Sequence, residues 1–342
     1  MKNTYRLEKI DPLTYKEEDW KRHFDFRVKT SALKNTPMPF DNVEDLKQFN
    51  VRNIEENEEE RYMVWKNEIE NGVFLFDKEF EDDLDKRFTC LNNYMLDKHL
   101  ESNLLEMIFE KFINYDEKSI ALAIHSKDGL NDHVEDLYSA QTGSITELSE
   151  LIVKEANMEK IDAWLAEAPA KFPNLRLEFY TDIPDNLLEE YAAFFTQMLE
   201  DLPAAQELGD TKITAASVKL DQEAESLGNA CSYRYLIFNE ANQLVAKTNV
   251  SIDRNDPQEM AQYMTGVKKE YRGRGLSKWL KAAMFKKLVA DFPKLEKINT
   301  DTHPENHASR ELSKQMGFKR TGSKKRFFID RANIVKSLNT NA

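Results

Sequence analysis

The chain has 342 residues, 41% of them hydrophobic, which is enough for two domains that each bury a core. Its formal charge of −13 disfavours a broad nucleic-acid-binding surface. Cys90 and Cys231 are far apart in sequence, the six histidines form no metal-binding motif, and the chain shows neither a membrane-spanning apolar run nor a signal peptide. We therefore expect a cytoplasmic protein with no metal, nucleic-acid or membrane partner.

The first half of the sequence alternates between strand-like and helix-like patterns. These patterns predict strands at residues 5–10, 61–67, 73–79, 88–99 and 119–125, and helices at residues 17–33, 43–51 and 101–114. A longer helical pattern covers residues 145–166, and a proline-containing segment from Ala168 to Pro173 follows it. We place a domain boundary there, which gives domains at residues 1–170 and 171–342.

The second half is predicted to be an α/β domain. Its strands are expected at residues 175–181, 232–239, 243–253, 258–268, 295–302, 319–322 and 326–330, and its helices at residues 185–202, 215–227, from Leu276 onward, and after Asn306. The most informative segment runs from Thr265 to Leu280, because it joins a strand to a helix through a turn rich in glycine and arginine.

That turn, Arg272-Gly273-Arg274-Gly275, has the features of an anion-binding site. Glycine lets the backbone bend and approach a phosphate closely, and the free N–H groups at the start of the following helix favour negative charge. The spacing is neither that of a P-loop nor that of a dinucleotide-binding loop, in which Lys278 would have to be glycine. ATP and NAD are therefore poor candidates.

The turn resembles motif A of the GNAT (GCN5-related) N-acetyltransferases, Gln/Arg-x-x-Gly-x-Gly/Ala, with Ser277 as its one departure. The segment from His303 to Phe318 resembles the same family's motif B, Asn-x-x-Ala-x-x-Leu-Tyr-x-x-x-Gly-Phe. Asn306 can cap the motif B helix, and Gly317 can end it in the left-handed conformation. Two linked motifs make acetyl-CoA the expected cosubstrate.

The resemblance implies two tandem GNAT-like domains, each with a mixed, mostly antiparallel sheet flanked by helices, as in mycothiol synthase-like proteins. Residues 96–103 occupy the place of the turn in the first half and contain no glycine, so we expect that half not to bind coenzyme A. The implied coenzyme A contacts in the second half are Thr265, Gly266, Val267, Arg272, Gly273, Arg274, Gly275, Leu276, Ser277 and Asn306.

Acetyl transfer to an amine requires stabilisation of an oxyanion, a proton for the thiolate and a base for the ammonium group. By resemblance, the Val267 amide is the candidate oxyanion donor, and Gly266 would permit a local bulge in the strand. The family's usual tyrosine acid is replaced by Ser313, which leaves Ser313 and Tyr263 as rival proton donors.

For the base, Glu259 or Asp301 could act through water, and His303 is a second-rank candidate. The expected function is transfer of acetyl from acetyl-CoA to a primary amine of a small molecule or protein. The alternatives are a non-catalytic acyl-CoA sensor and, less well supported by the acidic charge, an aminoacyl-tRNA-dependent transferase. The acceptor pocket is expected at residues 190–210 and 215–227. The sequence leaves the acceptor amine and the oligomeric state open.

Overall fold

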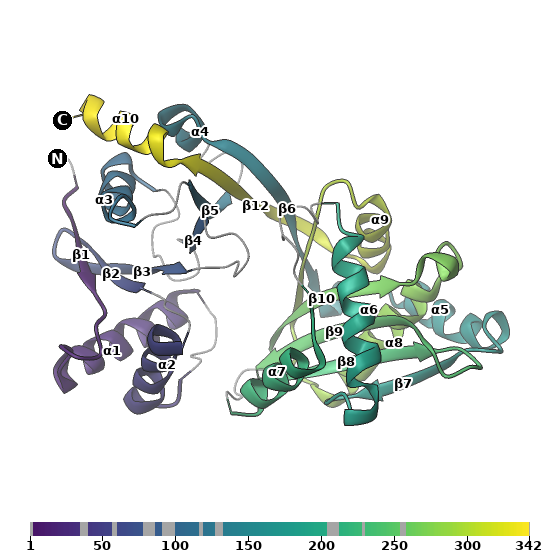
Figure 1. The fold of residues 1–342 in the computed structure, drawn as a ribbon. Helices are drawn as coiled ribbons and strands as arrows, with labels where there is room; N and C mark the ends of the chain where they lie inside the picture. Colours follow the sequence, from purple (N-terminus) through teal and green to yellow (C-terminus); the bar gives the residue numbers. More distant parts are fainter. Residues whose placement is uncertain are drawn as a thin grey trace. The chain divides into compact units, whose positions relative to one another are not determined.

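The chain forms two compact units. The computed structural model describes residues 3–34, 40–56, 60–77, 86–90, 100–115, 119–126, 133–203, 212–227, 230–253 and 258–341. The first unit contains residues 1–146 and 322–342, and the second contains residues 147–321 (Figure 1). The boundary expected at residues 170–171 is therefore wrong, because residues 147–170 belong to the second unit and the C-terminal residues return to the first.

The physical reason for this difference lies in the segment that was expected to be one long helix. Residues 141–152 instead form strand β6 (Gln141–Ile152), and helix α5 (Met158–Lys171) begins only after the Asn157 side chain has capped it by accepting from the Lys160 amide. β6 pairs antiparallel with β11 (Lys297–Thr302) in the second unit. Its partner lies far along the chain, so local periodicity could not reveal the strand.

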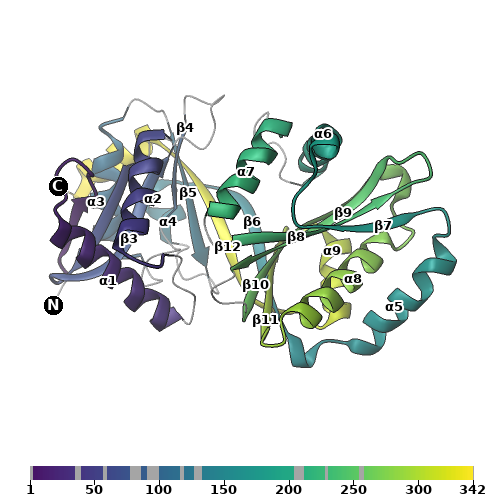
Figure 2. The ribbon, with the colours of Figure 1, turned by 90° about the horizontal axis from the view of Figure 1, so that it is seen from below.

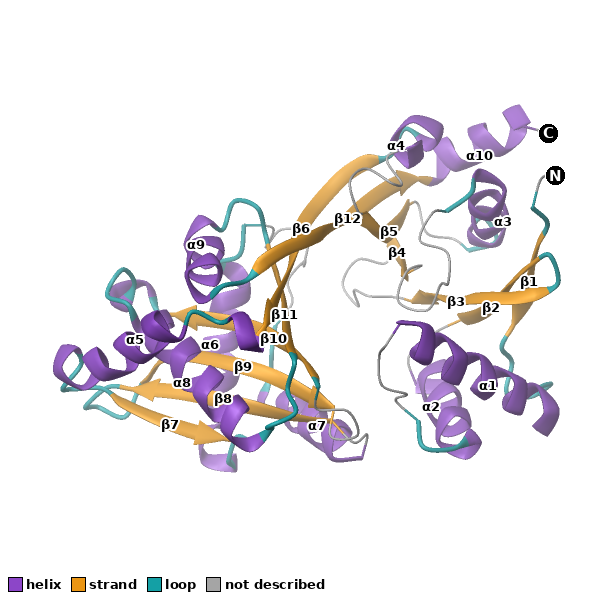
Figure 3. Ribbon diagram, turned by 180° about the vertical axis from the view of Figure 1, so that it is seen from behind, coloured by secondary structure: helices purple, strands orange, loops and turns teal. Residues whose placement is uncertain are grey.

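The first unit contains a mixed sheet with helices packed against it. The strand order in the sheet is β1-β2-β3-β4-β5-β12 (Figure 3). β4 and β5 are parallel, and the other neighbouring strands in this order are antiparallel. Its elements are β1 (Tyr5–Lys9), α1 (Glu17–Lys34), α2 (Val43–Glu56), β2 (Glu60–Lys66), β3 (Ile69–Asp77), β4 (Lys86–Cys90), α3 (Ser102–Phe112), β5 (Ser119–Ser126), α4 (His133–Tyr138), β12 (Lys319–Asp330) and α10 (Arg331–Asn341).

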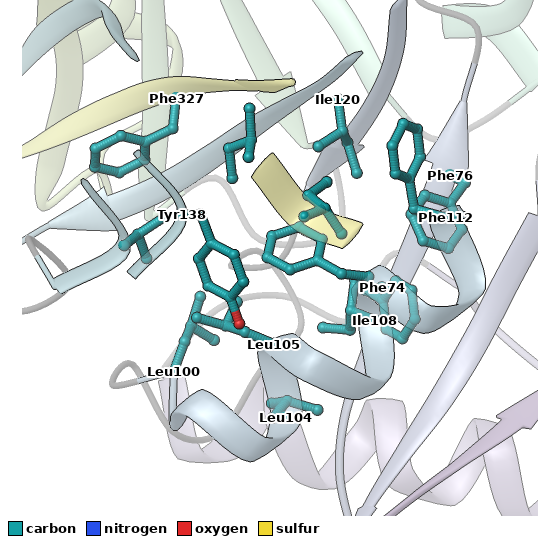
Figure 4. Packing of buried hydrophobic residues seen from close by; sticks show 14 of the residues in the cluster. Phe74, Phe76, Leu100, Leu104, Leu105, Ile108, Phe112, Ile120, Tyr138 and Phe327 are labelled. Atoms are coloured by element: carbon teal, nitrogen blue, oxygen red, sulfur yellow. The ribbon is translucent and has the colours of Figure 1, made fainter. Parts of the chain in front are cut away.

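The core of the first unit is built partly from the end of the chain. Phe327 and Ile329 of β12 and Ile334 of α10 are fully buried in the same cluster as residues of β3 and α3. Figure 4 shows Phe327 together with Tyr138 and the α3 side chains in this core. β12 is one continuous strand rather than the two short strands expected, and helices α4 and α10 were not predicted.

The second unit carries the sheet β6-β11-β10-β9-β8-β7, in which only β10 and β11 are parallel. Helices α6 and α7 cover one face, and α5, α8 and α9 cover the other (Figure 2). This arrangement confirms the expected mixed, mostly antiparallel α/β fold. The remaining elements are β7 (Arg176–Tyr180), α6 (Leu188–Glu200), α7 (Ala215–Leu227), β8 (Ala230–Phe238), β9 (Leu244–Asp253), β10 (Glu259–Val267), α8 (Leu276–Asp291) and α9 (His307–Met316).

A buried histidine makes the first unit sensitive to acid. His23 on α1 is 1% exposed, and burial together with Arg27, Arg61 and Arg22 lowers its pKa to about 3. In the unfolded chain this histidine has a pKa of about 6.5 and takes up a proton below that pH, whereas in the folded unit it stays neutral. The free energy of unfolding therefore falls as the pH falls from about 6.5 towards 3. We expect thermal unfolding to show that the free energy of unfolding falls less for His23→Gln than for the wild type over this range, with a full difference of roughly 5 kcal/mol. Parallel pH curves for the two proteins would contradict this expectation.

Candidate functional site

The centre of the second unit is a break in the pairing of strand β10. β10 and β11 pair in parallel from Glu259 to Gln262, and the pairing between the two strands ends there. The register between β10 and β9 also shifts between Gln262 and Thr265, which marks a β-bulge at residues 263–264. The two parallel strands therefore stop pairing beyond the bulge, on the segment that leads to the glycine-rich turn.

The bulge differs in place from the sequence expectation, which assigned it to Gly266. Gly266 pairs regularly with Lys247 of β9, so it is not part of the bulge. A side chain at this position would clash with α6. A Cβ atom on Gly266 would lie 1.7 Å from the Met198 methyl group of α6, so glycine permits the close approach of that side chain.

Backbone direction places the Val267 amide on the side of β10 away from β9. Lys268 donates its amide to the Val245 carbonyl of β9 at 2.9 Å. Successive strand residues direct their backbone groups to opposite edges, so the Val267 N–H points to the edge on which β11 lies. The Val267 carbonyl accepts from the Arg272 Nε at 2.9 Å, which ties the turn to the end of the strand.

Side chains next to this edge form a hydroxyl network. The Thr265 and Thr248 hydroxyl oxygens are 2.7 Å apart, and the Gln262 amide nitrogen lies 3.4 Å from each of them. Thr300 of β11 donates to the Gln262 carbonyl at 3.1 Å. These bonds fix the strand on both sides of the bulge without using the Val267 amide.

The turn adopts the backbone that its glycines permit. Gly273 and Gly275 have φ of +74° and +100°, and Gly275 directly precedes α8. The turn therefore presents the N-terminus of a 16-residue helix, where unpaired N–H groups and the helix dipole favour an anion. Leu276 and Ser277 are the first residues of that helix, and Leu276 is buried in the core beneath it.

Two of the basic side chains around the turn form ion pairs with the same carboxylate. Asp201, just after α6, pairs with Lys269 at 2.7 Å and with Arg272 at 2.5 Å. Burial opposes ionisation of Asp201, but the hydrogen bonds from these two cations outweigh it and lower its pKa. The Arg274 guanidinium donates to the Glu270 carbonyl at 2.9 Å and lies over the Tyr271 ring.

A cavity of about 790 Å³ adjoins the turn. The segment that joins α5 to β7 forms one wall, and the hairpin between β8 and β9 forms another. Lys171, at the end of α5, places its ammonium nitrogen 3.4 Å from the position of a Cβ atom on Gly275. The main lining residues are Lys171, Phe172, Asn174, Asn239, Tyr271 and Arg274. The cavity thus adds a cation and aromatic side chains beside the helix N-terminus.

The motif B residues lie where local chemistry predicts. The Asn306 side chain caps α9 by accepting from the Ser309 amide at 3.2 Å, and Gly317 ends the helix with φ of +108°. This cap occupies Oδ1 of Asn306, which was expected to contact coenzyme A. Ser313 is 5% exposed, and its hydroxyl lies 3.4 Å from the Lys281 ammonium of α8.

The other candidate catalytic residues differ in their exposure and in their interaction partners. Tyr263 lies in the bulge with 56% of its surface exposed, and desolvation together with Asp301 and Glu225 raises its pKa. Glu259 instead pairs with Lys297 at 2.6 Å, and this hydrogen bond helps to raise the pKa of Lys297. Asp301 therefore acts electrostatically on Tyr263, whereas Glu259 is held in a separate ion pair. His303 accepts from the Glu305 amide at 3.2 Å in the turn before α9.

Sequence reasoning missed a buried polar group on the opposite face of the sheet. Lys247 of β9 is fully buried beneath α6, donates to the Tyr191 hydroxyl at 2.8 Å and lies 3.4 Å from the centre of the Phe195 ring. Burial, with a smaller effect of Arg234, lowers the pKa of Lys247. Arg234 pairs with Glu225 of α7 at 3.2 Å. A lysine within the apolar run of β9 was the one available sequence signal.

The described residues contain no group of three or more side chains suited to hold a metal ion. Within the same parts of the chain, none of the helices combines the length and apolarity needed to cross a membrane.

Comparison with known proteins finds a sequence similarity within the second unit. The model of the acetyltransferase (GNAT) family matches residues 194–318. No curated protein sequence matches the chain. A solved tandem GNAT protein from the clavulanic acid biosynthesis pathway has a TM-score of 0.70 at 15% identity, over 96% of this chain and 99% of that one.

Two further solved structures share the fold at lower similarity. A GCN5-related N-acetyltransferase from Sphaerobacter thermophilus has a TM-score of 0.56 at 9% identity, over 96% of both chains. A glucosamine N-acetyltransferase region of a fungal multi-domain β-N-acetylglucosaminidase has a TM-score of 0.57 at 12% identity, over 96% of this chain and 38% of that one. The family model thus matches part of the second unit, and these solved structures share the fold of the whole chain, in which two GNAT-like units follow one another in tandem.

Proposed function

We propose that the second unit binds acetyl-CoA at the break between β10 and β11 and transfers its acetyl group to a primary amine of a small molecule or protein. Acetyl transfer is the reaction class of the matched family. The observation that carries the proposal is the continuous path from the unpaired edge of β10 to the positive-φ turn at the start of α8. An extended amide-containing arm fits the strand edge, and a pyrophosphate fits the turn.

Each part of this path has an assigned role in the proposal. Thr265 and Val267 hold the pantetheine arm through their backbone groups, and the Val267 N–H stabilises the oxyanion as the amine attacks the thioester. Gly273, Gly275 and the first amides of α8 hold the pyrophosphate, with Lys171 and Arg274 supplying positive charge nearby. Arg272 acts indirectly, because its guanidinium already joins Val267 to Asp201.

The acceptor amine enters from the face of the sheet that α6 and α7 cover. Tyr263 lies there at the bulge, and Asp301 and Glu225 are near enough to affect its pKa. In this proposal, Asp301 accepts the ammonium proton through water. Glu259 is a weaker candidate because Lys297 neutralises it. The first unit is proposed not to bind coenzyme A by this mode; residues 96–99 of its glycine-free turn lie outside the described residues.

The experiment that tests the function is a thiol-release assay with acetyl-CoA across small amines, polyamines, aminoglycosides and lysine-containing peptides. We expect release of coenzyme A that depends on one class of amine, with the acetylated product confirmed by mass spectrometry. Acetyl-CoA binding without turnover on any amine would favour the sensor alternative. Absence of acetyl-CoA binding would contradict the proposal as a whole.

A further inference from the structure

The seam between α8 and α9 contains a buried lysine that the proposed reaction does not yet use. Lys281 is 4% exposed, and its ammonium group lies 3.4 Å from the Ser313 hydroxyl and 5.8 Å from the centre of the Phe318 ring. Among the described residues, no carboxylate forms an ion pair with Lys281. Burying an amine without such a partner costs free energy, which makes a role beyond packing worth testing.

The chemistry of the two side chains fixes the direction of their hydrogen bond. A lysine ammonium group can only donate, so the Ser313 oxygen accepts from Lys281. The hydroxyl hydrogen of Ser313 is then free to point elsewhere, and the described residues offer it no acceptor. Lys281 therefore leaves the Ser313 hydroxyl able to donate to a bound ligand.

The pair lies at the level of the β10 segment assigned to the thioester. α8 runs back along β10, since Leu276 and Leu280 share a cluster with Val267, whereas Met284 shares one with Met260. Lys281 lies roughly 7 Å beyond the helix start, which corresponds to about two strand residues before Val267. That position is close to Thr265, where the pairing between β10 and β11 has ended.

We propose that Lys281 positions Ser313 and replenishes its proton, so that the Ser313 hydroxyl protonates the coenzyme A thiolate as it leaves. This inference rests on the proposed function. As the amine nitrogen bonds to the acetyl carbon, the carbon–sulfur bond breaks and its electron pair stays on sulfur. The sulfur takes the Ser313 proton, the Ser313 oxygen takes a proton from Lys281, and solvent later returns a proton to Lys281.

The surroundings of Lys281 suit this role. Burial lowers its pKa to about 8, so the group is protonated at neutral pH and yields its proton more readily than an exposed lysine. Several acidic groups on the neighbouring elements form ion pairs with other cations. Asp162 of α5 pairs with Lys286, Glu147 of β6 pairs with Arg310 of α9, and Glu150 and Glu259 pair with Lys297.

The test compares kcat, KM for acetyl-CoA and the pH profile of kcat for wild type, Lys281→Met, Lys281→Arg, Ser313→Ala and the double variant. We expect Lys281→Met and Ser313→Ala each to lower kcat by roughly 100-fold with little change in KM, and the double variant to lose no more than either. Wild-type kcat should fall above about pH 8. Lys281→Arg stays charged but cannot give its proton to Ser313, so it should have a lower kcat without that fall. Lys286→Met is the matched control on the same helix and should keep wild-type kcat.

The outcomes separate this role from the proposed function. If wild type turns over and Lys281→Met keeps both its kcat and its fall above pH 8, the role of Lys281 is wrong and acetyl transfer stands. Additive losses in the double variant would also overturn the coupling of the two residues. If wild type releases no coenzyme A with any amine, the proposed function fails, and the role of Lys281 fails with it. Melting temperatures and acetyl-CoA binding, measured for every variant, show whether a loss of kcat reflects unfolding.

Discussion

Removal of residues 322–342 is expected to unfold the first unit. The deletion takes away the part of β12 that pairs with β5 from Ser323 to Asp330. It also removes Phe327, Ile329 and Ile334, which are fully buried in the core of that unit. Losing three such side chains costs several kcal/mol each, which together exceeds the usual stability of a domain. Circular dichroism and proteolysis should show an unfolded first unit.

Two neighbouring point variants test the same core without shortening the chain. Ile334→Ala should lower the free energy of unfolding of the first unit by roughly 2–5 kcal/mol, because the side chain is fully buried. Val335→Ala is the matched control: Val335 is 38% exposed on the same helix, and its loss should cost less than about 1 kcal/mol. Equal effects of the two variants in chemical denaturation would refute this account of the core.

Gly275→Glu is expected to abolish tight binding of acetyl-CoA. Any side chain at φ of +100° strains the turn, and its Cβ would lie 3.4 Å from the Lys171 ammonium. The new carboxylate would also neutralise Lys171 and occupy the helix N-terminus that the pyrophosphate needs. We expect at least a roughly 100-fold rise in Kd, about 2.7 kcal/mol, in calorimetry.

Two further variants separate backbone strain from charge in this experiment. Gly275→Ala adds strain without a carboxylate and should raise Kd less than Gly275→Glu. At Gly273, φ is +74° and no atom of the described residues lies within 4 Å of an added Cβ, so Gly273→Asn should be the mildest, since asparagine tolerates this conformation. Wild-type affinity in Gly275→Glu, with an unchanged melting temperature, would mean that acetyl-CoA does not bind at this turn.

Most helices and strands of the second unit follow from local pattern. The strands at residues 175–181 and 243–253 and the helix from Leu276 were predicted because apolar spacing and turn residues agree there. Residues 145–152 show the limit of this approach. Their pattern is compatible with a helix, and only pairing with β11 makes them a strand. The domain boundary failed for the same reason, since both errors come from long-range pairing.

The residues of the candidate site also fall into those that the sequence predicts and those that only the tertiary structure shows. Gly273, Gly275, Asn306 and Gly317 have backbone or capping roles that short motifs predict, and the structure places each in the predicted conformation or cap. Lys171, Asp201 and Lys281 reach the site from separate elements, so their proximity depends on tertiary packing. A buried lysine is also hard to detect in sequence, because lysine is usually exposed and the position after Leu280 reads as polar.

The use of the last residues to complete the first unit has a consequence for synthesis on the ribosome. Domains usually fold in order from the N-terminus as the chain emerges. Here residues 147–321, which make up the second unit, are translated before β12 can reach β5. The second unit can therefore mature while the first still exposes the edge of β5 and an incomplete core. During that interval we expect the nascent N-terminal half to be the part of this protein that is most prone to aggregation.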